Sequence, residues 1–165
     1  ISEEKGIRIL MQIWNELPDI PLVVMGGGPL EGEFSRWADG HDNVYFLGYM
    51  QHDKCLSIVK GGEFVVFPSI WYEGCSMVEI ETESLGKGLI ATDLGFSTEA
   101  IEDGKNGYKV KLGDIKGFQK FIAELWSKPE LASKIGQNAR LDYEQKYRPE
   151  DNYEQLVAIY HKTIG

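Results

Sequence analysis

The chain has 165 residues, of which 42% are hydrophobic and 26% are charged, so it can bury a core and form one domain. Its 26 acidic and 17 basic side chains give a formal net charge of −9, which argues against a general nucleic-acid binder because such proteins carry a basic surface. Two cysteines without a C-x-x-C motif, no apolar run of membrane-spanning length and no signal peptide predict a reduced, cytoplasmic, soluble domain.

The first part of the chain alternates between helical and extended patterns. A helix over residues 2–17, with Ser2 as its N-cap, is predicted by a stripe of Ile7, Leu10, Met11, Trp14 and Leu17. Continuous apolar runs suit a parallel sheet that is covered on both faces. These runs predict strands over 21–25, 43–48 and 63–69, with helices over 30–38 and 52–61 between them.

The alternation continues with a helix over 76–86 and strands over 89–92 and 107–110. Three helices are then expected, the first with the stripe Phe118, Phe121, Ile122, Leu125 and Trp126, the second over 129–147, and the last with Tyr153, Leu156, Val157 and Tyr160. Strands that alternate with helices indicate β-α-β units with right-handed crossovers. The predicted fold is therefore an α/β domain with a doubly wound, Rossmann-like parallel sheet and C-terminal helices.

The start of the chain departs from this pattern. A doubly wound domain normally opens with a strand, whereas here a helix begins at once. We therefore expect the first strand, and with it a further domain, to lie before Ile1.

Ligands of open α/β sheets bind at the carboxyl ends of the strands, where helix N-termini attract anions. Four loops fall there: 26–29, 48–50, 68–76 and 92–99. The run Gly26, Gly27 and Gly28 lets a phosphate or sugar approach the backbone closely, or else forms a tight strand-to-helix turn. The chain contains neither G-x-G-x-x-G nor G-x-x-x-x-G-K-[ST], so dinucleotide and P-loop sites are disfavoured.

Two glutamates in the third loop and its helix are spaced eight residues apart. If the helix begins near Ser76, Glu73 precedes it and Glu81 lies roughly 8 Å along its axis. The free amides of residues 76–78 would lie between the two carboxylates. A carboxylate, an anion site and a second carboxylate follow one another here, in the order that sugar, diphosphate and ribose have in a nucleotide sugar. The carboxylates suit the two ends because a carboxylate accepts hydrogen bonds from vicinal hydroxyls.

The acids of this helix also have a purely structural interpretation. Ser76 and Glu79 fit a capping box, and the remaining acids would be solvated helix residues. We favour this interpretation for Glu79 and Glu83. For Glu73 and Glu81 the spacing alone leaves both interpretations open.

Several motifs together resemble the group-1 glycosyltransferases, which are retaining enzymes of GT-B fold that use nucleotide sugars. The motifs are SEEKG at the start, FLGYMQHDKCLSIVKGGEFVVFPS, E-x(7)-E from Glu73 to Glu81, GKGLIATDLG, the acid Glu99, and DGKNGYKV. The resemblance covers almost the whole chain in the order of the family. It implies that residues 1–165 are the C-terminal, donor-binding domain and that an N-terminal acceptor domain is absent.

The resemblance also implies residue roles. Lys5 would pair with the donor diphosphate, together with an arginine expected before Ile1. Glu73 would be the catalytic residue beside the transferred sugar, and Glu81 would hold the ribose. The remaining donor-binding residues would be Gly26, Gly27, Gly28, Tyr49, Met50, Gly74, Cys75, Ser76, Met77 and Val78.

Three positions depart from the family pattern. Cys75-Ser76 stands where an aromatic residue and a glycine are usual, Gly88 replaces a proline, and Phe96 replaces a glycine. His41, His52 and His161 have no catalytic spacing and are interpreted as surface residues. For Tyr49, Trp71 and Tyr72, both stacking on a ligand and packing at the rim remain open.

The function implied is retaining transfer of a hexose from a UDP-, GDP- or ADP-sugar to an acceptor hydroxyl, in polysaccharide or glycolipid synthesis. The acceptor would be a sugar or a lipid-linked glycan, reached in the cytoplasm or at the cytoplasmic face of a membrane. No cofactor or metal is expected because the chain has no D-x-D motif. The alternatives are a nucleotide-sugar 2-epimerase of the same architecture, and a non-catalytic nucleotide-sugar-binding or interaction domain.

Overall fold

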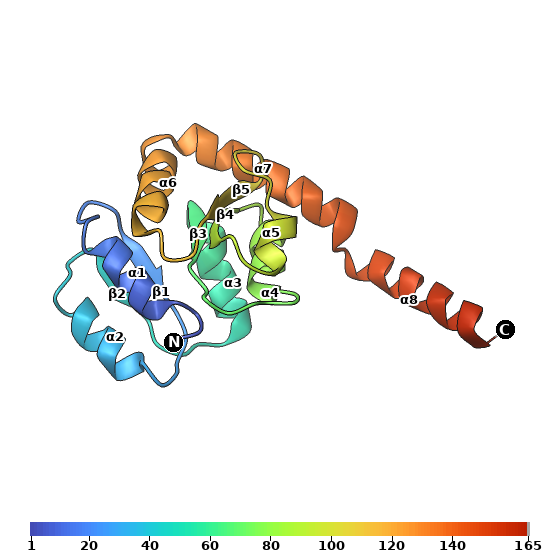
Figure 1. Ribbon diagram of the computed structural model, residues 1–165, viewed down its shortest axis with the longest axis horizontal. Helices are drawn as coiled ribbons and strands as arrows, with labels where there is room; N and C mark the ends of the chain where they lie inside the picture. The colour runs from blue at the N-terminus through green and yellow to red at the C-terminus, as the bar shows by residue number, and fades with distance from the viewer. Residues whose placement is uncertain (165) are drawn as a thin grey trace.

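The computed structural model describes residues 1–164 and confirms the predicted α/β class (Figure 1). The strands are β1 (Leu22–Val24), β2 (Val44–Phe46), β3 (Phe64–Phe67), β4 (Gly88–Thr92) and β5 (Gly107–Val110). The helices are α1 (Ile7–Trp14), α2 (Glu31–Ala38), α3 (His52–Gly61), α4 (Met77–Ser84), α5 (Phe96–Ala100), α6 (Ile115–Ser127), α7 (Pro129–Lys146) and α8 (Pro149–Ile164). In the described part of the chain, no helix is both long and apolar enough to cross a membrane.

The strands form two parallel sheets. In the first, β1 pairs with β2, with Leu22 opposite Val44. In the second, β4 lies between β3 and β5, and Leu89 faces Val65 on one side and Gly107 on the other. Within residues 1–164, β1 and β3 therefore each have one edge without a strand partner.

The hydrophobic core joins the two sheets through the helices. One cluster of buried side chains extends from α1 and β1 to α6 and α7. Its fully buried members include Ile13, Phe34, Ile90, Phe118 and Ile122. Helix α1 packs on α6, while α7 packs on β4 and on α4.

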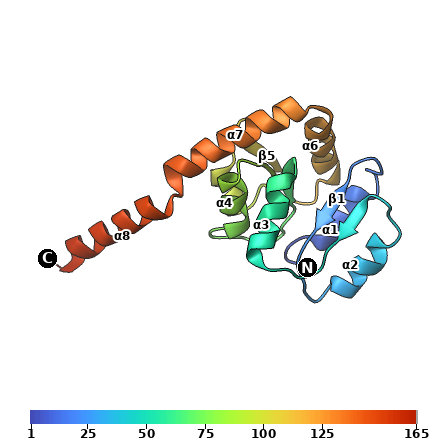
Figure 2. The same cartoon turned by 180° about the vertical axis from the view of Figure 1, so that it is seen from behind.

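A groove of about 850 Å³ separates the free edges of β1 and β3. Figures 1 and 2 show α1 and α3 on opposite sides of this region. Its lining is mostly apolar and includes Leu22 and Val24 of β1, Phe64 and Val66 of β3, Leu10 and Trp14 of α1, and Leu56 and Val59 of α3. Helix α3 has no buried residue within the described chain, because its apolar side faces this groove.

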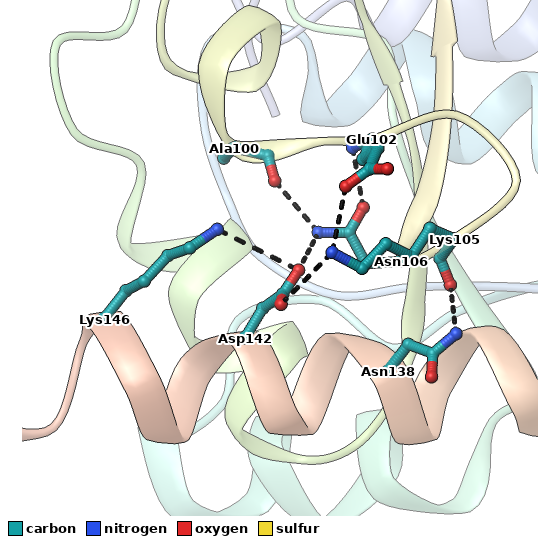
Figure 3. A network of polar contacts seen from close by, with 7 residues as sticks. All are labelled: Ala100, Glu102, Lys105, Asn106, Asn138, Asp142 and Lys146. Carbon is teal, nitrogen blue, oxygen red and sulfur yellow. Dashed lines mark hydrogen bonds and ion pairs between the residues drawn. The ribbon is translucent and has the colours of Figure 1, made fainter.

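A buried polar network fastens α7 to the turn that precedes β5 (Figure 3). The Asn106 amide donates to the Ala100 carbonyl at 2.9 Å and to Asp142 Oδ2 at 2.8 Å. Its oxygen accepts from the Glu102 backbone N–H at 2.8 Å. Lys105 lies 3.8 Å and Lys146 4.0 Å from the Asp142 carboxylate, so this largely buried charge is compensated.

Helix α8 continues from α7 and projects away from the rest of the molecule in both views (Figures 1 and 2). The predicted stripe forms a helix as expected, but three of its four residues, Tyr153, Leu156 and Tyr160, are exposed.

Two predicted boundaries are wrong. Helix α1 begins at Ile7 with Gly6 as N-cap, so Ser2 does not cap it. The reason is that the Glu4 carbonyl accepts hydrogen bonds from the Ile70 N–H at 2.9 Å and from Ser69 Oγ at 3.0 Å. These contacts hold the first residues in a turn. In addition, part of the loop expected over 92–99 forms the short helix α5.

Candidate functional site

The glycine loop after β1 lies against the start of the chain and against the loop after β2. The Gly26 N–H donates to the Gly48 carbonyl at 2.8 Å, and the Ile1 nitrogen donates to the Gly27 carbonyl at 2.8 Å. A Cβ atom on Gly28 would lie 2.3 Å from the Ile1 carbonyl oxygen, so only glycine allows this approach. The structure thus joins two of the predicted loops. Tyr49, beside them, is highly exposed and is not a core residue.

Lys5 and Glu73 form an ion pair at the end of β3. The Lys5 Nζ also lies 5.6 Å from the centre of the Phe67 ring, the last residue of β3. Half of the Lys5 side chain remains exposed, against 20% of the Glu73 side chain. The cation is therefore accessible from solvent, whereas the carboxylate is largely enclosed.

The N-terminus of α4 follows Glu73 directly. Ser76 is the N-cap residue, and the first helical residues, Met77 and Val78, are exposed. The first backbone N–H groups of an α-helix have no partner within the helix and attract anions. Gly74 and Cys75 are also exposed, so the backbone on both sides of the buried Ser76 is open to a ligand.

Glu81 lies on α4, and its Oε1 atom is 3.4 Å from His52 Nε2 at the start of α3. His52 is exposed, as the sequence predicted. The sequence did not predict its contact with Glu81, the residue expected to bind the ribose. Its position directly after the loop over 48–50, at the carboxyl edge of the sheet, was the available signal. Of the other two histidines, His41 bonds to the Trp37 carbonyl and to Asn15, and His161 is exposed on α8, so among residues 1–164 neither is seen to bond to a predicted site residue.

The structural interpretation of Glu79 and Glu83 as a cap residue and a solvated residue is wrong. Both are buried, with relative exposures of 1% and 3%. Within the described chain, the Ser76 side chain makes no capping hydrogen bond. Glu79 Oε1 instead accepts from Ser97 Oγ at 3.0 Å. The physical reason is that this face of α4 packs against α7 and β4, so acids at these positions cannot reach water.

Burial changes the protonation of both acids. The pKa of Glu83 is raised to about 7, chiefly by burial and also by the nearby Asp142 carboxylate, while Lys146 acts in the opposite direction. The pKa of Glu79 is also raised by burial, while the Ser97 and Ser76 hydroxyls act in the opposite direction. One oxygen of each carboxyl, Oε2, is buried without a hydrogen-bond partner among residues 1–164.

Helix α5 holds the backbone at Glu73. The Phe96 N–H donates to the Glu73 carbonyl at 2.8 Å. Gly95 has φ +60°, and a Cβ there would lie 2.6 Å from the same carbonyl oxygen. Position 95 therefore requires glycine. This role was not predicted, although the position lies in one of the four candidate loops.

Together these groups provide complementary chemistry at one edge of the molecule. A lysine and free helix amides can bind an anion, while carboxylates on either side of the α4 N-terminus can accept hydrogen bonds from hydroxyls. The family model for glycosyl transferases group 1 matches residues 1–142. The chain belongs to the group 1 glycosyl transferases.

A curated relative among the group 1 glycosyl transferases is the Escherichia coli O-antigen chain mannosyltransferase C, which is 29% identical over 160 residues. This alignment covers 94% of the chain and 43% of the relative, so the chain spans less than half the length of the relative.

Solved structures show the same architecture. Anabaena HepE in complex with UDP superposes with a TM-score of 0.87 at 20% identity, over 98% of this chain and 46% of that one. The C-terminal domain of the group 1 glycosyl transferase LpcC from Francisella tularensis gives a TM-score of 0.76 at 26% identity, over 90% of this chain and 83% of that one. The Rossmann-like half of a GT-B fold predicted from the sequence is thereby confirmed.

Proposed function

We propose that this group 1 glycosyl transferase chain binds the nucleotide-sugar donor, and that the full-length protein transfers the hexose to an acceptor hydroxyl with retention of configuration. The observation that carries this proposal is the Lys5–Glu73 ion pair beside the open N-terminus of α4. Lys5 and the helix amides form an anion site, and the Glu73 carboxylate lies next to it. Such a pair suits the junction between a sugar and a diphosphate.

The proposed roles follow the chemistry of the transfer. The difficult step is departure of the nucleoside diphosphate, which leaves an oxocarbenium-like sugar. Lys5 and the amides of residues 76–78 stabilise the departing negative charge. Glu73 contacts the sugar at the reacting centre. Glu81 accepts hydrogen bonds from the ribose, and His52 lies beside it.

The glycine loop and its neighbour complete the proposed donor site. Gly26, Gly27 and Gly28 line the diphosphate side, and Tyr49 and Met50 lie beside the base. The structure of HepE with UDP and the mannosyltransferase name of the E. coli relative support a nucleotide-sugar donor, a UDP-, GDP- or ADP-hexose. We propose no metal and no cofactor for this site, since anion stabilisation is assigned to Lys5 and the helix amides.

We further propose that the chain is the C-terminal, donor-binding domain of a two-domain enzyme, and that a strand before Ile1 occupies the groove between β1 and β3. The groove has one free parallel edge on each side, with α1 and α3 over its two faces. Ile1 contacts Gly27 at the carboxyl end of β1, so a strand that runs into Ile1 would be parallel to both neighbours. The LpcC domain, of which this chain covers 83%, supports this division.

The acceptor is proposed to be a sugar or a lipid-linked glycan bound mainly by the second domain. The mannosyltransferase relative supports a place in polysaccharide or glycolipid synthesis. Cys55 and Cys75 are both free, which suits a reducing compartment, so we propose that the reaction takes place in the cytoplasm or at the cytoplasmic face of a membrane.

Calorimetry and product analysis on the full-length protein test the proposal. UDP, GDP and ADP, and then their hexose derivatives, are titrated, and the sugar nucleotide that binds is incubated with candidate glycan acceptors. The expected result is binding of one nucleotide series and transfer with the anomeric configuration retained. A free epimerised sugar would instead indicate the epimerase, and binding without any product would indicate a non-catalytic domain. If no nucleotide binds, the proposed donor site is wrong.

A further inference from the structure

Glu79 is a charged side chain in a place where charge is unfavourable. It is 1% exposed, burial raises its pKa, and its Oε2 atom has no hydrogen-bond partner among the described residues. A leucine would fill such a position without this desolvation cost. The carboxyl therefore needs an explanation in terms of what its other oxygen does.

That oxygen, Oε1, joins two elements which otherwise have few contacts. It accepts a hydrogen bond from Ser97 Oγ at 3.0 Å, and Ser97 is itself only 3% exposed. Ser97 belongs to α5, a helix of five residues that is too short to be stable without tertiary contacts. The bond between Glu79 and Ser97 thus fixes where the first turn of α5 lies relative to α4.

The first turn of α5 in turn fixes Glu73. The residue before Ser97, Phe96, donates its N–H to the Glu73 carbonyl at 2.8 Å, and Gly95 lies against the same peptide group. The Glu73 side chain is held separately, by Lys5. Glu73 is consequently held at two points, and one of them depends on the position of α5.

We propose that Glu79 is a positioning residue for Glu73: through Ser97 it fixes α5, and α5 fixes the backbone of Glu73 beside the α4 N-terminus. This inference rests on the proposed function, because it makes Glu79 a determinant of how the transferred sugar is held. It assigns no contact between Glu79 and the donor.

The assignment separates sugar binding from nucleotide binding. Removing the Ser97 hydroxyl loosens the Glu73 peptide and leaves Lys5, the α4 amides and Glu81 in place. The transferred sugar is therefore the part of the donor that loses its contact, while the diphosphate and the ribose keep theirs. A purely structural role for Glu79 would instead change all ligands alike through general destabilisation.

Four variants of the full-length protein test this proposal. Ser97→Ala removes the donor to Glu79, and Glu79→Leu removes the acceptor while keeping a side chain of similar volume. Glu79→Gln keeps an acceptor oxygen and serves as the rescue. Glu83→Leu is the matched control, because Glu83 is buried on the same helix one turn further on and no hydrogen bond joins it to α5 among residues 1–164.

The first measurement needs no ligand. Hydrogen exchange followed by mass spectrometry should show faster exchange over residues 70–76 and 93–98 in Ser97→Ala and Glu79→Leu. Glu79→Gln and Glu83→Leu should exchange there like the wild type. Unchanged exchange in Ser97→Ala and Glu79→Leu, or equal acceleration in Glu83→Leu, would overturn the positioning role whatever the protein binds.

The second measurement compares the UDP-, GDP- or ADP-hexose that the wild type binds with the corresponding nucleoside diphosphate. Ser97→Ala and Glu79→Leu should weaken the sugar nucleotide or lower its turnover about three- to ten-fold, the effect of one hydrogen bond, and leave the diphosphate within about two-fold. Equal losses for both ligands would overturn the proposal. If the wild type binds none of these ligands, the proposed function fails, and the exchange measurement alone decides the link between Glu79 and Glu73.

Discussion

Lys5 and Glu73 are 68 residues apart in the sequence and form an ion pair at the end of β3. The Lys5 side chain is half exposed, so the pair contributes little to stability. Its importance is chemical, since a bound diphosphate must share the lysine with the glutamate. One cation would then orient the sugar-side carboxylate and bind the leaving group.

Lys5→Ala should weaken nucleoside diphosphate more than nucleoside, by about 1–2 kcal/mol for one charge-assisted contact. The nucleoside lacks the diphosphate and should bind as before. Isothermal titration of both ligands measures the difference. Lys60→Ala, at an exposed lysine in the last turn of α3, is the control for the loss of one positive charge. Equal weakening of both ligands would remove Lys5 from the diphosphate site.

Substitutions of Glu73 and Glu81 should weaken the binding of different ligands. Glu81→Ala should weaken nucleoside and nucleoside diphosphate alike, by about 1–2 kcal/mol, because both ligands contain the ribose. Glu73→Ala should not weaken either of them, and should weaken only the sugar nucleotide and lower its turnover. Each variant is the control for the other in the same titrations. Similar loss of nucleoside diphosphate in both variants would contradict the order sugar, diphosphate, ribose.

Glu83 should make the free energy of unfolding depend on pH. Its pKa is raised by burial to about 7 in the folded state, from 4.5 for the ordinary carboxyl. The folded protein therefore binds this proton more tightly than the unfolded chain, and stability falls as pH rises from about 4.5 to 7. From pH 4.5 to pH 7, the free energy of unfolding of the wild type should fall by on the order of 2–3 kcal/mol relative to that of Glu83→Gln.

Urea unfolding of both proteins across this pH range measures the effect, and the change in their difference with pH is the quantity to compare. Glu130→Gln, at an exposed glutamate of α7, should show no such change relative to wild type. A constant difference between wild type and Glu83→Gln would mean that folding does not raise the pKa of Glu83.

Asn106→Ala should destabilise the protein by about 2–3 kcal/mol. The substitution removes two buried hydrogen bonds and one partly buried one, and leaves the Ala100 carbonyl and the Asp142 carboxylate short of a donor. Asn138→Ala, which removes one exposed bond to the Lys105 carbonyl, should cost less than about 1 kcal/mol. Chemical denaturation of the two variants gives the comparison, and a loss in Asn106→Ala as small as about 1 kcal/mol would show that the Asn106 bonds in Figure 3 are not a stabilising element.

The fold could be predicted because each strand and each long helix carries its own local signal. Apolar runs such as those of β1 and β3 indicate a covered sheet, and the stripe from Phe118 to Leu125 indicates α6. Helix α5 was not predicted because five residues are too few for a periodic pattern. Its position depends on Ser97 and Phe96 meeting α4 and Glu73, which are contacts between distant segments.

For the candidate site too, local sequence signals could be predicted and contacts between distant segments could not. Glu73 and Glu81 were found by spacing along one segment, and Lys5 by resemblance. The burial of Glu79 and Glu83 could not be read from spacing, because a helix with acids on both faces gives no sign of which face packs. The contact between His52 and Glu81 likewise joins two helices that the sequence treats separately.

The edges of β1 and β3 that have no strand partner within residues 1–164 are of the kind that can template aggregation. Exposed strand edges recruit other extended segments, and natural proteins protect them with lysine, proline or bulges. The sequences of β1 and β3, LVV and FVVF, contain none of these residues. A segment that fills the groove between them would therefore do more than complete the sheet, since it would also keep neighbouring copies of the protein from adding their own strands during synthesis and folding.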